Sequence, residues 1–356
     1  MDLNALLRRA VDDGASDVHL KLGHAPVIRR DGQLAELEGF DPLDHAALAE
    51  VLARLGYADT FTGELDTAYQ DEGLPRFRVN AYRQRGATSF AFRVIPAQIP
   101  SFEDLRMPPA VRALADEHRG LVLVTGATGS GKTTTLAAMV DHMNRTRRQH
   151  ILTIEDPIEI LHADQGCIVD QREVGLDTAS FGEALRRALR QDPDVILIGE
   201  LRDAETAQTA LQAAESGHLV LSTLHTVDAA ETCGRLVEFF PAEKRDVVRS
   251  ILAGVLRGVV SQRLLPRVDG GRVAAVEVMV MNARIADLIR EGRADEIEDA
   301  VAEGEFHGMQ TFAQALIERV LAGEVDREVA ANAATNRHDF MVALERAEKA
   351  CAAALA

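Results

Sequence analysis

The stretch that most constrains this chain is residues 121–139, which read LVLVTGATGSGKTTTLAAM. Residues 126–133 match the full GxxxxGK(S/T) pattern of a phosphate-binding loop. The apolar, β-branched run before the loop predicts a buried strand, and the run after it is made of good helix formers. A glycine-rich loop between a strand and a helix is the setting in which this pattern binds the phosphates of a nucleotide.

The residue types of the loop suit a polyphosphate. Gly126, Gly129 and Gly131 let the backbone bend until several N–H groups point at one phosphate. Lys132 is expected to reach the β- and γ-phosphates, and Thr133 to offer its hydroxyl to Mg²⁺. We therefore expect ATP and Mg²⁺ as cofactors. The predicted nucleotide-binding residues are Gly126, Ala127, Thr128, Gly129, Ser130, Gly131, Lys132, Thr133 and Thr134.

Composition narrows the class of protein. The chain has 356 residues, which is enough for two or three domains. A net charge of -17, with only 4% aromatic residues, argues against nucleic acid as a partner, because such binding needs a basic face and stacking platforms. No run approaches the ~20 apolar residues that span a bilayer, and the N-terminus lacks the apolar core of a signal peptide. We expect a cytoplasmic protein with no direct membrane insertion.

The pattern of strands and helices changes along the chain. Residues 1–100 mix half-buried strands with amphipathic helices, which predicts a small α+β domain with helices on one side of a sheet. Residues 101–117 contain prolines and are predicted to be an interdomain linker. Residues 118–356 begin with alternating strands and helices, which favours a mostly parallel sheet covered on both faces. From about Arg284 the chain looks helical.

Acidic residues follow two of the predicted parallel strands. Ligands of such sheets bind beyond the carboxyl ends of the strands. Glu155 and Glu159, in TIEDPIE, are therefore candidates to hold the Mg²⁺ shell or orient water, although they could instead form a capping cluster around Pro157. Glu200 ends the apolar strand DVILIG, and we assign it to polarise the attacking water; its alternative role is a helix cap. The predicted metal set is Thr133, Glu155 and Glu200.

Two histidines flank the strand in SGHLVLSTLHT. Either His218, before the strand, or His225, at its end, could sense the γ-phosphate as a neutral donor or as imidazolium. A lone histidine at a strand end is more often a structural residue. His225 is the better candidate because it lies at the carboxyl end of its strand.

Four segments together resemble one protein family. In their order and spacing they are similar to the Walker A, Asp, atypical Walker B and His boxes of the secretion ATPase superfamily. The N-terminal GASDVHL and RFRVNAYRQRGATSFAFRVIP are similar to the PAS-like domain of the PilT group, the retraction ATPases of type IV pili, and the closing LIREG and GMQTF also resemble that group. The four boxes are GATGSGKT, ILTIEDPIE, DVILIGELRDAET and GHLVLSTLHT.

The resemblance implies a PAS-like N-terminal domain followed by a RecA-like P-loop ATPase domain with C-terminal helices. It implies a homohexameric ring, with ATP in the cleft between the two domains, that powers pilus retraction and twitching motility. The implied partners are an inner-membrane platform protein and the pilus machinery, which would place the ring at the inner face of the membrane. Arg78 and Arg93 could then reach phosphate as arginine fingers, or could lie on a solvated strand face.

The sequence departs from the group in two places. The group's AIRNLIRE signature has changes here at Arg284, Ala286 and Asp287, and Ala127 replaces the usual proline of the phosphate loop. Two other functions stay open: a pilus-extension or type II secretion ATPase, and an accessory subunit that binds nucleotide without strong hydrolysis. The absence of a tetracysteine insert argues against the first, and intact Lys132 argues against the second.

Overall fold

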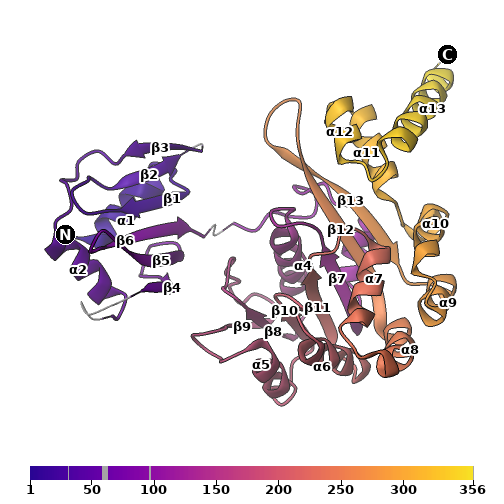
Figure 1. The fold of residues 1–356 in the computed structure, drawn as a ribbon, viewed down its shortest axis with the longest axis horizontal. Helices are drawn as coiled ribbons and strands as arrows, with labels where there is room; N and C mark the ends of the chain where they lie inside the picture. Colours follow the sequence, from indigo (N-terminus) through magenta and orange to yellow (C-terminus); the bar gives the residue numbers. More distant parts are fainter. Residues whose placement is uncertain (31, 58–62, 96–97, 356) are drawn as a thin grey trace. The chain divides into compact units, whose positions relative to one another are not determined.

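The structure is a computed structural model that describes residues 1–355 apart from 31, 58–62 and 96–97. The chain divides into two compact units. The first comprises residues 1–98 together with 159–161, and the second comprises 99–158 and 162–356. Both are traced by sequence colour in Figure 1.

The first unit is an antiparallel sheet with helices on one face. Its strand order is β3-β2-β1-β6-β5-β4. Apolar side chains at alternate strand positions, such as Phe77 and Val79, form one core with the buried leucines of both helices. The α+β architecture with helices on one side is as predicted. The elements are α1 (Leu3–Asp12), β1 (Asp17–Leu20), β2 (Val27–Arg30), β3 (Gln33–Glu36), α2 (His45–Arg54), β4 (Glu64–Tyr69), β5 (Phe77–Gln84) and β6 (Ala87–Val94).

The second unit is built on a seven-stranded sheet of order β13-β12-β7-β11-β10-β8-β9. Neighbouring strands are parallel except β12 and β13, which form an antiparallel pair at one edge. The mostly parallel sheet is confirmed. Its strands are β7 (Gly120–Thr125), β8 (His150–Glu155), β9 (Ile168–Glu173), β10 (Val195–Ile198), β11 (Leu219–Leu224), β12 (Leu256–Pro266) and β13 (Arg272–Val280).

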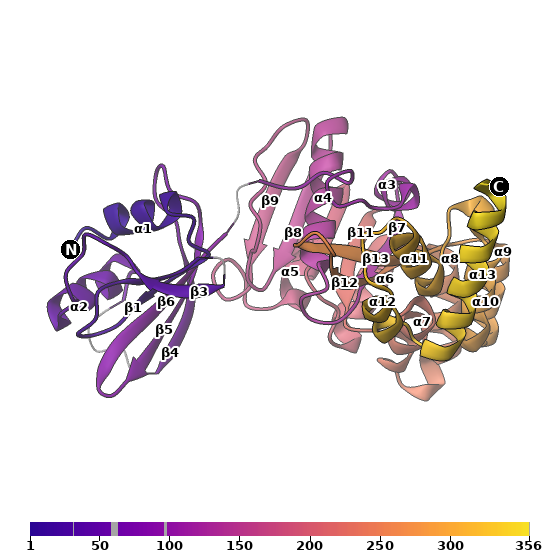
Figure 2. The same cartoon turned by 90° about the horizontal axis from the view of Figure 1, so that it is seen from above.

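Helices cover both faces of this sheet. One core cluster packs α3 and α4 on one face, and another packs the helices from α5 through α10 on the other face. The last helices, α11, α12 and α13, gather beside β12 and β13 (Figures 1 and 2). The helices are α3 (Pro109–Ala115), α4 (Lys132–Thr146), α5 (Phe181–Ala188), α6 (Ala204–Glu215), α7 (Ala229–Glu238), α8 (Arg245–Val255), α9 (Ala283–Glu291), α10 (Ile297–Ala302), α11 (Phe312–Leu321), α12 (Arg327–Ala333) and α13 (Arg337–Leu355).

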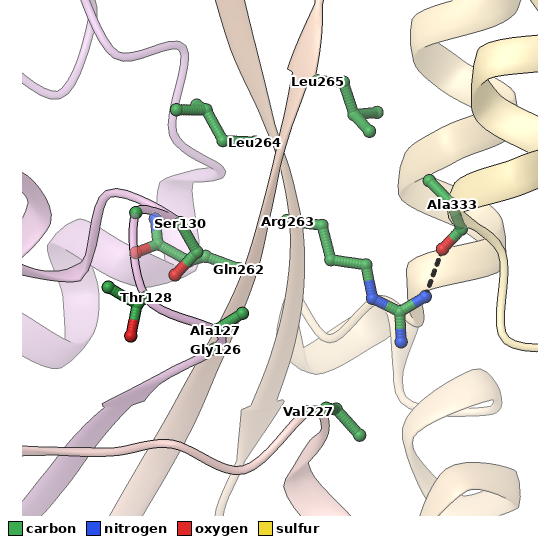
Figure 3. Close-up of a pocket in the computed structure, with 11 residues that line it drawn as sticks. Gly126, Ala127, Thr128, Ser130, Val227, Gln262, Arg263, Leu264, Leu265 and Ala333 are labelled. Carbon is green, nitrogen blue, oxygen red and sulfur yellow. Dashed lines mark hydrogen bonds between the residues drawn. The ribbon is translucent and has the colours of Figure 1, made fainter.

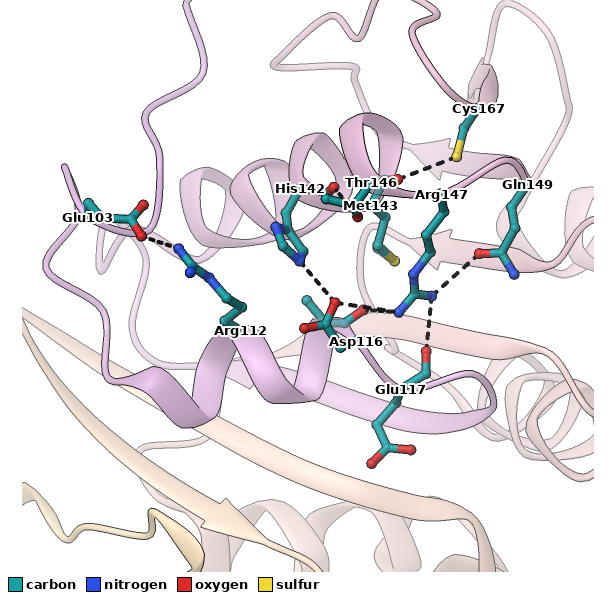
Figure 4. Close-up of polar contacts among 11 residues, drawn as sticks. Glu103, Arg112, Asp116, Glu117, His142, Met143, Thr146, Arg147, Gln149 and Cys167 are labelled. Carbon is teal, nitrogen blue, oxygen red and sulfur yellow. Dashed lines mark hydrogen bonds and ion pairs between the residues drawn. The ribbon is translucent and has the colours of Figure 1, made fainter.

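Residues 101–117, expected to link two domains, lie within the second unit and contain α3. The prolines begin this helix: Pro108 is its N-cap and Pro109 its first residue, where a missing N–H costs nothing. Arg147, beyond the end of α4, donates to the carbonyls of Ala115 and Glu117 at 2.8 and 3.0 Å (Figure 4). This segment is therefore fixed to the helix that follows the phosphate loop.

The topology decides where polar strand ends meet. β7, β11, β10 and β8 run parallel as neighbours, so their carboxyl ends lie along one edge of the sheet. The phosphate loop, His225 and Glu200 follow the ends of β7, β11 and β10, and Glu155 is the last residue of β8. Across the described residues, no helix has the combination of length and apolar character that crossing a bilayer requires.

Candidate active site

The phosphate loop runs from the end of β7 to Gly131, the N-cap of α4. Gly126 adopts a φ of 138° and Gly131 a φ of 94°, both in the region that favours glycine. A Cβ on Gly126 would lie 2.4 Å from the Gln262 carbonyl oxygen and 2.6 Å from Ser130 Oγ. A Cβ on Gly129 or Gly131 would meet no atom within 4 Å, so these glycines leave the inner side of the loop open to a phosphate.

Donors converge on this loop. Lys132 Nζ donates to the carbonyl oxygens of Gly126 and Ala127, at 2.7 and 3.0 Å. The Ser130 hydroxyl is buried and has no hydrogen-bond partner among the described residues. The first turn of α4 leaves its N–H groups pointing along the helix axis toward the loop. A lysine, an orphaned hydroxyl and a helix N-terminus fit a polyphosphate, whose oxygens only accept hydrogen bonds.

A cavity of about 370 Å³ adjoins the loop. Its far wall is the end of β12, where Arg263 reaches toward Ala333 at the end of α12 (Figure 3). Arg263 donates to the Ala333 carbonyl and to Thr335 Oγ1, and its guanidinium lies 3.9 Å from the ring centroid of Phe312. The lining residues are Gly126, Ala127, Thr128, Gly129, Ser130, Val227, Gln262, Arg263, Leu264, Leu265 and Ala333.

Sequence reasoning missed the β12 wall of this cavity. Ser261 accepts from the Thr125 hydroxyl at 2.9 Å, and Gln262 donates to Thr135 Oγ1 in α4 at 2.8 Å. The signal was present as three polar residues, Ser261 to Arg263, between the apolar pairs 259–260 and 264–265 of this strand. Polar side chains at such buried positions need partners, and here those partners belong to β7, α4 and the C-terminal helices.

Glu200, His225 and Arg202 are brought together beside the phosphate-loop edge. Glu200 Oε1 lies 3.2 Å from His225 Nε2, and Glu200 Oε2 accepts from Arg202 Nε at 2.9 Å. Arg202 also lies 3.9 Å from Asp156. The Glu200 side chain is only 17% exposed, whereas His225 is 48% exposed. The helix cap that the sequence left open for Glu200 is instead Asp203, which caps α6.

The other two candidate carboxylates differ from each other. Glu155 accepts hydrogen bonds from Thr153 Oγ1 at 2.6 Å and from Gln171 at 3.0 Å. It ends β8, the strand that pairs with β10, so it lies at the strand end next to the one that leads to Glu200. Glu159 is exposed, and no hydrogen bond joins its side chain to the part of the chain that the structure describes. The geometry therefore favours Glu155 over Glu159.

The side chains near the loop suit Mg²⁺ better than a metal held by protein alone. Within the described ranges, no group of three or more His, Cys, Asp and Glu residues could hold a metal ion. Mg²⁺ usually keeps several waters and binds through one or two carboxylates plus substrate phosphates. Thr133, in the first turn of α4, with Glu155 and Glu200 at neighbouring strand ends, offers oxygen ligands of that kind.

Three predicted residues lie elsewhere. His218 precedes β11, at the amino edge of the sheet, and its Nδ1 lies 3.0 Å from Ala213 O and from Ser216 Oγ, so it closes the end of α6 instead of reaching the phosphate loop. Arg78 and Arg93 are cross-strand partners in the sheet of the first unit. Arg93 donates to Asp17 at 2.8 Å.

Comparison with known proteins agrees with this geometry. The model of the type II/IV secretion system protein family matches residues 1–331. The chain is 45% identical to the type IV pilus retraction ATPase PilT of Pseudomonas aeruginosa, over 96% of this chain and 100% of that protein. It is 47% identical to a twitching motility protein of Neisseria gonorrhoeae, over 77% and 73% of the two chains.

A solved structure shares the fold. The crystal structure of the pilus retraction motor PilT with bound ADP has a TM-score of 0.88 and 41% identity, covering 95% of this chain and 98% of that one. A RecA-like P-loop unit preceded by a small α+β unit is the fold common to both. The chain therefore belongs to the type II/IV secretion system protein family and is an ATPase of that family.

Proposed function

We propose that the chain is a motor that hydrolyses ATP with Mg²⁺ to retract type IV pili, the process that drives twitching motility. The observation that carries this proposal is the contact of Glu200 with His225 at the edge that bears the phosphate loop. The same chain matches relatives named for pilus retraction and for twitching motility over most of its length.

The residues divide the chemistry among them. Lys132 and the loop N–H groups bind the β- and γ-phosphates, and Thr133 with Glu155 would hold Mg²⁺. Bound Mg²⁺ supplies positive charge to the phosphate oxygens. Glu200 orients a water and accepts its proton, while Arg202 fixes the carboxylate through Oε2. His225, which contacts the other oxygen of Glu200, is the proposed sensor of the γ-phosphate.

The motor is proposed to be a homohexamer in which a neighbouring copy supplies an arginine to the site. Arg78, Arg93 and Asp17 form a row across β5, β6 and β1, opposite each other in register. Inward-pointing Phe77 and Phe92 fill the other face of these strands, so the row lies on the face without helices. Arg93 is paired with Asp17, whereas Arg78 has no side-chain hydrogen bond or ion pair to a described residue. Arg78 is therefore the stronger candidate to reach the site of a neighbouring copy.

Two of the three changes in the AIRNLIRE-like segment, Arg284 and Asp287, lie on the outer surface of α9, and the third, Ala286, is buried in the core. Ile285, Leu288 and Ile289 keep the buried apolar face, whereas Arg284 and Asp287 are exposed. Arg284 pairs with Glu303, and Asp287 accepts from Arg290 at 2.8 Å. The helix therefore keeps a buried apolar face that includes Ala286, and the changes at Arg284 and Asp287 alter the surface offered to a partner. We propose the pilus platform protein at the inner face of the membrane as that partner.

The test is a deletion strain of the source organism, scored for surface pili and twitching. Retraction predicts cells that keep surface pili and no longer twitch. Complementation with the unmodified gene should restore twitching, and complementation with a Glu200→Gln copy should not. Bald cells would instead identify an extension ATPase, and unchanged pili and twitching would identify an accessory subunit.

A further inference from the structure

Glu277 is a buried carboxylate that lies away from the catalytic edge of the sheet. Glu277 lies in β13 with its residue only 5% exposed. Its strand neighbours Val276 and Val278 belong to the core on the opposite face of the sheet. Burying a carboxylate without partners is costly, so its contacts must offset that cost.

Two helices begin at this carboxylate. The backbone N–H of Ala229, the first residue of α7, donates to Glu277 Oε1 at 2.8 Å. The backbone N–H of Phe312, the first residue of α11, faces the same carboxylate and lowers its pKa. A helix N-terminus has unpaired N–H groups and a partial positive charge, so one carboxylate here stabilises the start of two helices.

The start of α7 is tied to the catalytic edge. The chain passes from His225, which contacts Glu200, through Val227, which lines the cavity, to Asp228, the N-cap of α7. Asp228 accepts from the Glu231 N–H, and Glu231 accepts from the Val227 N–H. A displacement of the first turn of α7 would therefore move the segment that holds His225 against Glu200.

The start of α11 is tied to the same cavity through a second route. The ring of Phe312 packs under the Arg263 guanidinium, and Arg263 lines the cavity beside the phosphate loop. Arg263 also donates to Thr335 Oγ1, and Thr335 lines a small cavity together with Glu277 and Asp228. Glu277 thus lies between two helix starts that are each connected to the candidate site.

We propose that Glu277 is a positioning residue for ATP hydrolysis: its ionised carboxyl holds the first turns of α7 and α11 together, so that His225 stays against Glu200. The role needs the negative charge, because the partial positive charges of two helix N-termini attract a carboxylate more strongly than a neutral carboxyl group. Protonation of Glu277 therefore weakens its attraction to both helix starts. This inference rests on the proposed hydrolysis of ATP at the phosphate loop.

The surroundings make this carboxyl sensitive to pH. Burial raises the pKa of Glu277 to about 7, against the opposing effect of the Ala229 N–H. Asp228 of α7 and Glu298 of α10 raise it further, and the Phe312 N–H lowers it. Arg263 of β12 is the cation that faces these carboxylates. The carboxyl therefore changes its charge within the physiological range of pH.

The experiment compares wild type with Glu277→Gln in steady-state ATP hydrolysis from pH 6 to pH 8.5. Glutamine keeps the size of the side chain and one acceptor oxygen but cannot ionise. We expect the wild-type kcat to fall as the pH is lowered through 7. We expect the kcat of Glu277→Gln to stay near the low-pH wild-type value throughout, so that the two curves separate only above pH 7. The two proteins should have the same KM for ATP, because the substitution changes no contact of the phosphate loop.

The matched control is Glu298→Gln, which removes an exposed carboxylate from the same small cavity but no helix contact. Because Glu298 raises the pKa of Glu277, its loss should move the pH limb slightly to lower pH and leave kcat above that limb at the wild-type value. A wild-type profile in Glu277→Gln, or a loss confined to KM, overturns the proposal. If Glu277→Gln does not fold, Glu277→Asp is measured instead; its shorter carboxylate should lower kcat and keep the pH limb, and an unchanged kcat overturns the proposal. A wild-type protein without ATPase activity at any pH refutes the proposed function itself.

Discussion

A carboxylate that activates water must be held in one orientation, and Glu200 is held from both sides by Arg202 and His225. We predict that Glu200→Gln binds ATP with near-normal affinity but hydrolyses it about 10²–10⁴-fold more slowly, which is the usual contribution of a general base. Binding by calorimetry and phosphate release by a coupled assay separate the two effects. Near-normal turnover would move the assignment to Glu155, which sits at the next strand end.

Lys132 serves the phosphate loop in two ways, because its ammonium also bridges the carbonyls of Gly126 and Ala127. We predict that Lys132→Ala weakens ATP binding by about 10–100-fold, since a hydrogen bond to a charged group contributes roughly 1.5–3 kcal/mol. Isothermal calorimetry measures this directly. Lys21→Ala, at an exposed lysine of the first unit, is the control and should bind ATP as wild type does. Unchanged binding by Lys132→Ala contradicts the phosphate-loop assignment.

At the scale of elements, β12 and β13 connect the phosphate loop to the C-terminal helices. Ser261 and Gln262 bind β7 and α4, Arg263 binds the end of α12, and Glu277 binds the start of α7 and faces the start of α11. These contacts alternate between the two faces of the pair, as side chains of a strand do. A change at the loop therefore has short polar routes to helices far along the sequence.

The raised pKa of Glu277 predicts how the stability of the protein depends on pH. Burial raises the folded-state pKa of Glu277 to about 7, above its unfolded value, so the folded protein binds this proton more tightly. The resulting stabilisation is fully present below the unfolded pKa and is lost as the pH rises through about 7. Relative to Glu277→Gln, wild type should lose roughly 3 kcal/mol between pH 4.5 and pH 8. Denaturant unfolding of both proteins at several pH values measures the difference, and parallel curves would contradict it.

At the scale of the whole molecule, force requires that one subunit move another. A closed ring of identical subunits provides heterologous interfaces through which each hydrolysis step can displace a neighbour. A cation from that neighbour can also stabilise charge on the transferred phosphoryl group, as arginine fingers do. Arg78 and Arg93 are the proposed sources.

We predict that Arg78→Ala lowers turnover by about 10³-fold or more if it acts as an arginine finger, without loss of stability. Arg93→Ala should also lose the exposed ion pair with Asp17, which costs at most about 1 kcal/mol. The specific activity of the wild type should rise with protein concentration as rings assemble. Sedimentation in the presence of ATP measures that assembly. A fully active monomer, with activity independent of concentration, would contradict both the ring and the motor.

The sequence by itself determined the parts that depend on local chemistry. The GATGSGKT loop, the apolar runs of β7 and β10 and the alternation of β5 were readable because loop, buried strand and half-buried strand each impose a distinct residue pattern. The position of Glu200 and His225 after parallel strands was enough to place both at the same edge.

Only the tertiary structure decided what depends on contacts between distant residues. His218 and His225 flank the same strand, and the direction of β11 separates them, placing one at α6 and the other at Glu200. Proline suggested a linker at 101–117, but Pro109–Ala115 forms a helix, and Arg147, beyond the end of α4, donates to the Ala115 carbonyl. Arg263 and Glu277 are visible in the sequence as charges inside apolar runs, but their partners are not, because the helix ends that they contact come from distant parts of the chain.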